Sequence, residues 1–189
     1  MPKTIWLIDG AYLLKSSAAH GKFDYIKLKN ELEEINGGEF KEIYYLNSVK
    51  DSSAAQQNAF HNWLKSAPPT GPKMRVKLYG LKEMSVRCGE CGQTTARPVQ
   101  KGVDVGIATL IIKLASQNQY DRLLLSAGDG DFEDAIDYVK SELHKEIWLA
   151  GFSGNVSPDL QSYADKVIWL EKHWDRIGMG NSPVADETE

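Results

Sequence analysis

Apolar and polar positions follow two different periods along this chain. Short segments rich in β-branched and aromatic residues predict buried strands, because parallel strands covered on both faces are nearly continuous apolar runs. The predicted strands are TIWLID (4–9), EIYYLN (42–47), MRVKLYG (74–80), DRLLLSAG (121–128), EIWLAG (146–151) and KVIWLE (166–171). Between them, apolar residues recur every three or four positions, which predicts amphipathic helices. These positions are Tyr25, Leu28, Leu32 and Ile35; Phe60, Trp63 and Leu64; Val103, Ile107, Leu110, Ile111 and Leu114; and Phe132, Ile136, Val139 and Leu143.

The order of these segments predicts the fold class. Strand and helix alternate nearly throughout, and Ser157 with Pro158 forms a cap and first-turn pair that opens another short helix before the last strand. Such alternation is typical of an α/β fold with a mostly parallel central sheet and helices on both faces. We therefore expect one α/β domain over residues 1–175.

Two segments interrupt the alternation. Residues 81–100 lack a clean period and contain the knuckle RCGECG, so we expect an insertion there, such as a hairpin, ahead of the helix near Gly102. Residues 176–189 are mostly small, polar and acidic, and they offer too little apolar surface to offset the entropy of ordering. They predict a flexible acidic tail.

Length and cysteine content indicate the number of domains and the cellular compartment. A chain of 189 residues, 42% of them hydrophobic, can bury one good core. Its apolar runs fall short of the roughly 20 residues of a membrane span, and the start, MPKTIWLIDG, lacks the features of a signal peptide. The chain has only two cysteines, Cys88 and Cys91, which are too few and too close to form the disulfides that stabilise a secreted scaffold. We expect a cytoplasmic protein.

Charge is segregated along the sequence. The net charge is −4, but residues 72–101 contain seven basic side chains against two acidic ones, so the rest of the chain carries −9. A net negative charge alone argues against a nucleic-acid partner. The basic segment is either a solvated loop or a surface that contacts phosphates.

Aspartates stand where a parallel sheet binds its ligands, beyond the carboxyl ends of the strands. Asp9 ends the first predicted strand, and Gly10 lets the chain turn without a side chain that would crowd the site. Asp129 and Asp131 follow the strand LLLS, and carboxylates this close repel each other unless a cation compensates. The alternatives are a helix cap or turn at Asp9 and a solvated acidic turn before Phe132.

The segment KGVDVG places Lys101 and Asp104 at the start of a helix. An aspartate in a first turn is ordinary, because it complements the helix dipole. If the elements meet at one end of the sheet, however, four carboxylates converge and offer the oxygen ligands that Mg²⁺ or Mn²⁺ prefers. Lys101 would then contact a phosphate or simply pair with a carboxylate.

Four fragments carry a resemblance to a known family. LIDGAYL, KGVDVGIATLIIKLA, LLSAGDGDF and GNVSPDLQSYADKVIWL occur in the order that is typical of the NYN domain, in particular its LabA-like bacterial branch within the PIN-like nucleases. The resemblance covers about residues 4–170. It implies a Rossmann-like, three-layer PIN-like fold and metal-dependent cleavage of RNA, with the family's acidic positions at Asp9, Asp104, Asp129 and Asp131. It further implies supporting, substrate-binding roles at Gly10, Lys101, Ser126 and Ser157, and a supporting role at Asp165.

The chain departs from the family at two positions. It has Tyr12 where NYN domains often have asparagine, and Leu110 where many have a further aspartate. Both differences would remove polar groups near the expected metal. They fit slow turnover, one metal instead of two, or a binder without activity.

The expected chemistry is hydrolysis of phosphodiester bonds. One ion would lower the pKa of a bound water and polarise the phosphoryl group, and a second ion about 4 Å away would stabilise the leaving oxygen. We expect Asp9 and Asp129 to be direct ligands, and Asp104 and Asp131 to be further ligands or to position water.

Cys88 and Cys91 have the spacing of half a zinc knuckle. A structural zinc needs four ligands. Either two subunits of a homodimer each contribute a pair, or histidines complete the site, or the cysteines stay reduced and bind no metal.

Two other functions compete with a ribonuclease. A non-catalytic RNA-binding or regulatory module would keep the PIN-like fold and lose turnover. A haloacid-dehalogenase-like phosphatase also has an acidic loop similar to AGDGDFEDA, but that class needs an acid two residues after its nucleophilic aspartate, where this chain has Ala11.

Overall fold

Six strands form one sheet, and all of them run parallel. The structure is a computed structural model that describes residues 1–49, 55–80, 82–87, 91, 93–99 and 102–180. The strand order is β3-β2-β1-β6-β7-β8. The bounds are β1 Thr4–Asp9, β2 Glu42–Val49, β3 Arg75–Gly80, β6 Arg122–Ser126, β7 Glu146–Gly151 and β8 Lys166–Trp169. Each of the six predicted strands is therefore confirmed.

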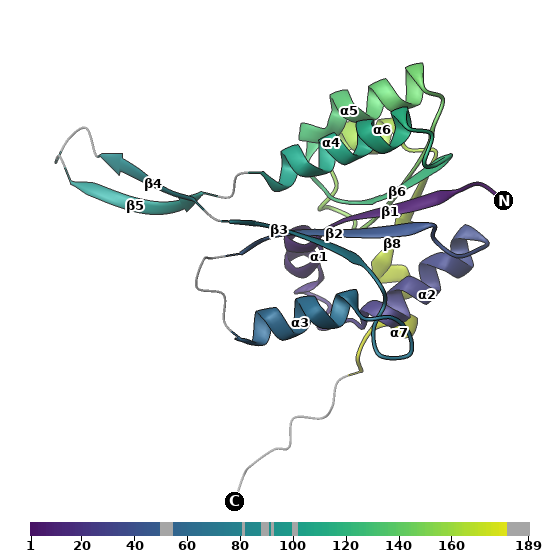
Figure 1. Cartoon of the computed structure of the whole chain (residues 1–189), viewed down its shortest axis with the longest axis horizontal. Helices are drawn as coiled ribbons and strands as arrows, with labels where there is room; N and C mark the ends of the chain where they lie inside the picture. The colour runs from purple at the N-terminus through teal and green to yellow at the C-terminus, as the bar shows by residue number, and fades with distance from the viewer. Residues whose placement is uncertain (50–54, 81, 88–90, 92, 100–101, 181–189) are drawn as a thin grey trace, which may run out of the picture.

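Helices cover both faces of the sheet (Figure 1). One face carries α4 (Val103–Ser116), α5 (Glu133–Asp137) and α6 (Pro158–Tyr163), and the other carries α1 (Gly10–Ser17), α2 (Tyr25–Asn36), α3 (Ala55–Lys65) and α7 (Trp174–Ile177). Short turns flank them, namely the 3₁₀ helices η1 (Gly130–Phe132) and η3 (Leu170–His173) and the π-helical turn η2 (Tyr138–Glu142). The α/β class with three layers is confirmed.

Alternation along β1 divides the core in two. Ile5 and Leu7 are buried in the cluster that includes α4, whereas Trp6 and Ile8 are buried in the cluster that includes α2. Successive side chains of a strand point to opposite faces, so one apolar run supplies both cores. The nearly continuous apolar run of β1 is thus explained by its burial on both faces of the sheet.

The insertion between β3 and α4 is an antiparallel hairpin, as expected. Its strands, β4 (Lys82–Arg87) and β5 (Thr94–Val99), form a separate two-stranded sheet that projects from the body (Figure 1). Cys91 is exposed and has no disulfide partner among the described residues, which do not include Cys88. Among the residues that the structure describes, no group of three His, Cys, Asp or Glu side chains could hold a metal. The zinc-sharing homodimer is therefore not supported, and we do not carry it further.

The packed chain extends slightly past the predicted boundary at residue 175. Ile177 is fully buried, Gly178 bridges to Phe23, and the Met179 N–H donates to the Lys22 carbonyl at 2.9 Å. Residues 181–189 of the predicted tail lie outside the described residues. In the described part of the chain, no helix is long and apolar enough to cross a membrane.

Candidate active site

The strand order reverses between β1 and β6. From β1 the chain builds β2 and β3 on one side, and α4 then leads to β6, β7 and β8 on the other. Ligands of open parallel sheets bind beyond the carboxyl ends of the strands at such a reversal. Asp9 ends β1, and the loop that carries Asp129 and Asp131 follows β6. The topology thus brings these carboxylates to one edge.

Asp9 is at once a helix cap and a pocket residue. Its Oδ1 accepts hydrogen bonds from the N–H groups of Ala11 at 2.9 Å and Tyr12 at 3.1 Å, so it starts α1. In the contacts of the described residues, its Oδ2 is not used by this cap. Burial raises the pKa of Asp9, and the charges of Asp104 and Asp129 raise it further against the cap hydrogen bonds.

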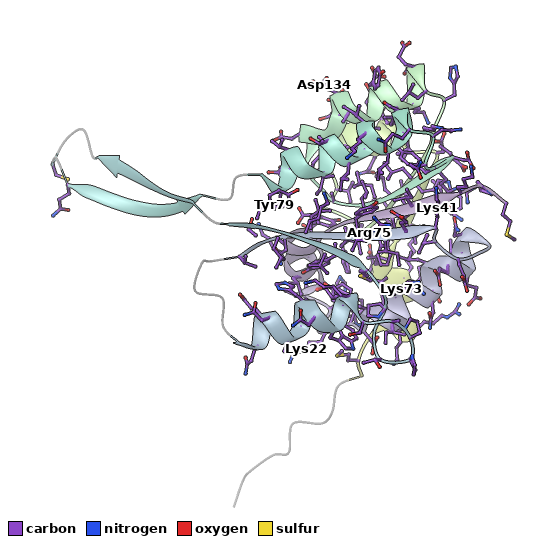
Figure 2. All side chains as sticks on the ribbon, in the orientation of Figure 1. Lys22, Lys41, Lys73, Arg75, Tyr79 and Asp134 are labelled. Carbon is purple, nitrogen blue, oxygen red and sulfur yellow. The ribbon has the colours of Figure 1, made fainter. Side chains whose placement is uncertain are left out.

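Asp104 lies in the first turn of α4, and Tyr79 at the end of β3 fixes that turn (Figure 2). A Cβ on Gly106 would lie 2.1 Å from the Tyr79 Oη, and one on Gly102 would lie 3.0 Å from its ring. Gly102 also has a φ of 111°, which favours glycine. Burial raises the pKa of Asp104, followed by the charges of Asp129 and Asp131.

The loop after β6 is held by close packing. A Cβ on Gly128 would lie 2.0 Å from the Asn155 carbonyl oxygen and 2.4 Å from the Tyr12 ring. Asp129 caps η1, because its Oδ1 accepts from the Asp131 N–H at 3.2 Å. Asp129 therefore caps η1 and, in the same conformation, remains available to bind a ligand.

Two pockets meet at Asp104. One, of about 420 Å³, is lined by Asp9, Asp104 and Asp129 together with Tyr12, Lys15 and Asn155, and we call it the acidic pocket. The other, of about 430 Å³, is lined by Asp104, Asp131, Glu133 and Asp134. The four predicted aspartates are thus divided between two pockets: Asp9 and Asp129 line the first, Asp131 lines the second, and Asp104 lines both.

Sequence patterns did not identify Lys15 or Asn155 as site residues. Lys15 lies on α1, a helix of eight residues that was too short to be predicted from its periodicity. Asn155 lies within the fragment GNVSPDLQ, but asparagine in a loop is usually a turn former. In the folded chain both residues line the acidic pocket with the carboxylates. Asn155 is placed there by the packing of its backbone against Gly128.

The model of the NYN domain matches residues 3–171 of this chain. The chain belongs to the NYN domain family. It is 25% identical over 170 residues to the low amplitude and bright protein LabA of Synechococcus elongatus, a match that covers 86% of this chain and 81% of LabA. This similarity supports the LabA-like branch. NYN domains are PIN-like nucleases, which indicates a nuclease-type function.

A solved structure shows the same fold. It is the crystal structure of a protein of unknown function from Vibrio parahaemolyticus, with a TM-score of 0.65 and 21% identity. The match covers 93% of this chain and 96% of the other. At this identity the likeness supports the fold of this NYN domain alone.

Several residues with predicted supporting roles have structural explanations in this NYN domain. Ser126 is fully buried, and its Oγ accepts from the Trp6 Nε1–H at 2.9 Å, which gives it a structural contact within the core. Gly10 is required because a Cβ there would lie 2.3 Å from Tyr45. Ser157 caps α6 by accepting from the Leu160 N–H at 3.2 Å, as its sequence predicts. Lys101 lies outside the described residues.

Asp165 lies away from the acidic pocket. It precedes β8, at the amino ends of the strands, where it accepts from the Ile147 N–H at 2.8 Å and from Lys140 at 2.6 Å. Although burial opposes it, these hydrogen bonds lower the pKa of Asp165. These two contacts connect Asp165 with β7 and η2.

The two departures from the NYN pattern lie in different environments. Tyr12 lines the acidic pocket, and its Oη accepts from the Phe152 N–H at 3.2 Å. Burial raises the pKa of Tyr12 to about 12, so its hydroxyl remains neutral. Leu110 is 6% exposed and belongs to the core under α4, not to either acidic pocket. Of the two changes, only the one at Tyr12 therefore lies where it could affect a bound metal.

The donor set fits a hard divalent cation held largely by water and substrate. No three carboxylates in the described residues form a ready cage. Mg²⁺, however, is usually bound by one or two carboxylates, with waters and substrate phosphates in the other positions. Asp9, Asp104 and Asp129 share a pocket, and the charge of Asp129 adds to burial in raising the pKa of Asp9 and of Asp104, a cost that a cation would offset.

Proposed function

We propose that this protein is a metal-dependent endoribonuclease that hydrolyses RNA phosphodiester bonds at the acidic pocket. The observation that carries the proposal is the shared pocket itself. Three carboxylates from three separate elements face it, at the carboxyl edge of a parallel sheet where the strand order reverses. Membership in a family of PIN-like nucleases supports the same chemistry.

Asp9 and Asp129 would hold Mg²⁺ or Mn²⁺, with Asp104 as a further ligand and Asp131 positioning water from the neighbouring pocket. When bound, the ion supplies an acidic water and stabilises charge on the phosphoryl oxygens. The cap hydrogen bonds fix the Asp9 carboxylate, and Tyr79 fixes the turn that carries Asp104. These side chains therefore need little reorganisation.

Lys15 and Asn155 would orient the RNA. Both are exposed at the rim of the acidic pocket, where an ammonium and an amide can donate to phosphate oxygens. Lys15 is the cation that the described residues place beside the carboxylates in this pocket. Asn155 lines the same pocket, and its carbonyl oxygen packs against Gly128. Together they would position the scissile phosphate between them.

The test is cleavage of labelled single-stranded and structured RNA in Mg²⁺, Mn²⁺ or EDTA. Asp129→Asn removes the charge but keeps a good helix cap, so we expect a folded protein whose cleavage falls by at least about 100-fold. Asp137→Asn is the matched control, because this exposed carboxylate bonds Ser141 and lines neither acidic pocket. Equal cleavage by the unmodified and Asp129→Asn proteins would contradict the proposal.

A non-catalytic RNA-binding module is the second candidate, and Tyr12 favours it. Its ring fills space at the acidic pocket where many relatives have a smaller amide. RNA that is bound but never cut across substrates and metals would decide for this module.

The nuclease domain would span residues 1–175 in our proposal, and the protein would act in the cytoplasm of a bacterial cell. Only two cysteines, three residues apart, are too few for the disulfide framework of a secreted protein, which supports a reducing compartment. The LabA similarity supports a bacterial source.

A further inference from the structure

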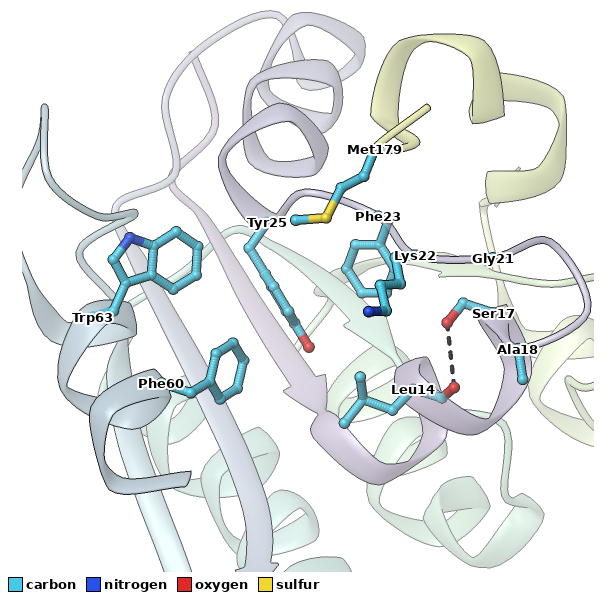
Figure 3. A pocket seen from close by; sticks show the side chains of 10 residues that line it. All are labelled: Leu14, Ser17, Ala18, Gly21, Lys22, Phe23, Tyr25, Phe60, Trp63 and Met179. Carbon is cyan, nitrogen blue, oxygen red and sulfur yellow. Dashed lines mark hydrogen bonds between the residues drawn. The ribbon is translucent and has the colours of Figure 1, made fainter. Parts of the chain in front are cut away.

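A second, apolar pocket lies on the other side of α1 from the acidic pocket. It has a volume of about 660 Å³ and lies between α1, the start of α2 and α3 (Figure 3). We call it the aromatic pocket. Its walls include Leu14, Lys22, Tyr25, Phe60, Trp63 and Met179.

Flat rings form the inner wall of the aromatic pocket. Phe60 and Trp63 lie nearly parallel, with ring centroids 6.0 Å apart and an interplanar angle of 29°. Tyr25 packs against Phe60 at 5.6 Å and is only 4% exposed. The Met179 thioether reaches over Tyr25 from the opposite side (Figure 3). Flat aromatic faces beside a polarisable sulfur suit a planar ring ligand.

Positive charge accompanies these rings. The Lys22 side chain ends between Phe23 and Leu14, directed over the pocket (Figure 3). Lys15 and Lys22 are both exposed, and within the described residues neither has an ion-pair partner. The ligand that complements this surface therefore combines a planar ring with negative charge.

One helix connects the aromatic pocket with the acidic pocket. Leu14 lines the first and its neighbour Lys15 lines the second. At ~1.5 Å of rise per residue, the length of α1 separates Asp9 from Ser17 by roughly 12 Å. A single polyanionic strand crossing α1 can therefore occupy both pockets at once.

We propose that the aromatic pocket binds an unpaired base of the RNA strand whose phosphodiester lies in the acidic pocket. The base stacks on the aromatic wall, and Lys22 and Lys15 contact the intervening phosphates. The proposal rests on the proposed function and adds a base-binding subsite to it, and the bound base must be unpaired, because a base held in a helical stack cannot enter the pocket.

The test uses short single-stranded RNAs with 2-aminopurine at successive positions, bound to the Asp129→Asn protein so that they stay intact. We expect the fluorescence to change strongly at one or two adjacent positions, where stacking occurs. An abasic site at that position should raise the Kd by about tenfold.

Variants of the pocket give an independent measurement. Trp63→Leu removes a stacking ring, and Leu14→Glu puts a carboxylate at a side chain that is 51% exposed and thus leaves the core intact. We expect each to raise the Kd for single-stranded RNA about tenfold and to abolish the position-specific fluorescence change. Tyr138→Leu, an aromatic that is 43% exposed on η2, is the matched control and should bind normally.

The outcomes separate the two proposals. If RNA is bound and cut but abasic substitution, Trp63→Leu and Leu14→Glu all leave the Kd unchanged, the base pocket is wrong and the nuclease stands. If RNA is neither bound nor cut, the proposed ribonuclease function is wrong, and the base pocket that depends on it is wrong as well. A dimer in sedimentation that Leu14→Glu dissociates would also overturn the base pocket, because the surface would then serve a second copy of this chain.

Discussion

Asp9 shows how one side chain can satisfy local structure and a site together. Its Oδ1 caps α1 and its burial raises its pKa, which is costly unless a cation approaches. Its position at a strand end was predictable from the parallel-sheet pattern. That the cap uses only one of its two oxygens was not, because it depends on where α1 begins.

Ser126 provides a test that separates packing from substrate binding. Ser126→Ala leaves the buried Trp6 Nε1–H without an acceptor, so we expect a loss of about 1–3 kcal/mol in the free energy of unfolding. Urea denaturation measures it, with Ser116→Ala at an exposed helix position as a nearly neutral control. Cleavage per folded molecule should not change. A specific loss of cleavage would restore a functional role to Ser126.

Asp104 is expected to destabilise the metal-free protein at neutral pH. Its pKa is raised, so ionisation carries a penalty that is complete above the folded pKa and absent below the unfolded value of about 3.9. Asp104→Asn should therefore raise the stability by ~0.5 kcal/mol after screening, or about 1–2 °C in Tm. Thermal unfolding should show this advantage at pH 7 and its loss as the pH falls towards 4.

Divalent metal should reverse the order of these two proteins. Mn²⁺ stabilises whichever protein binds it, so the unmodified protein should gain more in Tm than Asp104→Asn. An equal gain in both would remove Asp104 from the metal site. A lower Tm for metal-free Asp104→Asn would mean that the favourable interaction with the α4 dipole outweighs the repulsion.

Long elements were predicted well from the sequence, whereas short ones were not. Helices α2 and α4 follow long apolar periods, but α1 and α7 have eight and four residues, less than a reliable period requires. Helix α7 exists because tertiary contacts hold it. Glu31 of α2 is 3% exposed and accepts from Arg176 at 2.7 Å and contacts His173 at 2.7 Å. Such pairing over long sequence distances has no local signal.

The junction between α2 and α7 is the basis of a prediction at the scale of elements. Arg176→Ala leaves the buried Glu31 carboxylate with one partner, His173. Because the Arg176 side chain is itself 56% exposed, we expect a measurable loss in the free energy of unfolding, smaller than for a fully buried pair. Lys172→Ala, at a neighbouring exposed position, should change the stability by less than about 0.5 kcal/mol. Equal effects would show that this ion pair contributes nothing specific.

At the scale of the whole molecule, the strand order decides where the site lies. The alternation of elements predicted a parallel sheet, and the rule for its carboxyl edge predicted the positions of Asp9 and Asp129. The presence of Asp131 in a different pocket from Asp9 was not predictable, because both pockets form where α4 packs beside the loop after β6, a contact between distant segments. The aromatic pocket could not be predicted from the sequence either, since its rings come from distant segments and resemble ordinary core residues.

The hairpin of β4 and β5 should contribute to RNA binding and little to stability. It forms a two-stranded sheet of its own, separate from the six-stranded sheet of the body. It also carries Lys82, Arg87 and Arg97, part of the basic segment of an otherwise acidic chain. Replacement of residues 82–99 by a short Gly/Ser linker should therefore change the free energy of unfolding by less than about 1 kcal/mol.

Salt dependence distinguishes the charge of the hairpin from its bulk. Changing Lys82, Arg87 and Arg97 to Gln keeps the hairpin but removes three cations. If all three contact phosphates of single-stranded RNA, the slope of log K against log salt should become shallower by about 2, since each contact contributes about 0.7. The linker variant should show the same change. An unchanged slope in both would mean that the hairpin does not touch RNA, and a shallower slope in the linker variant alone would assign the contacts to its backbone or to its polar side chains.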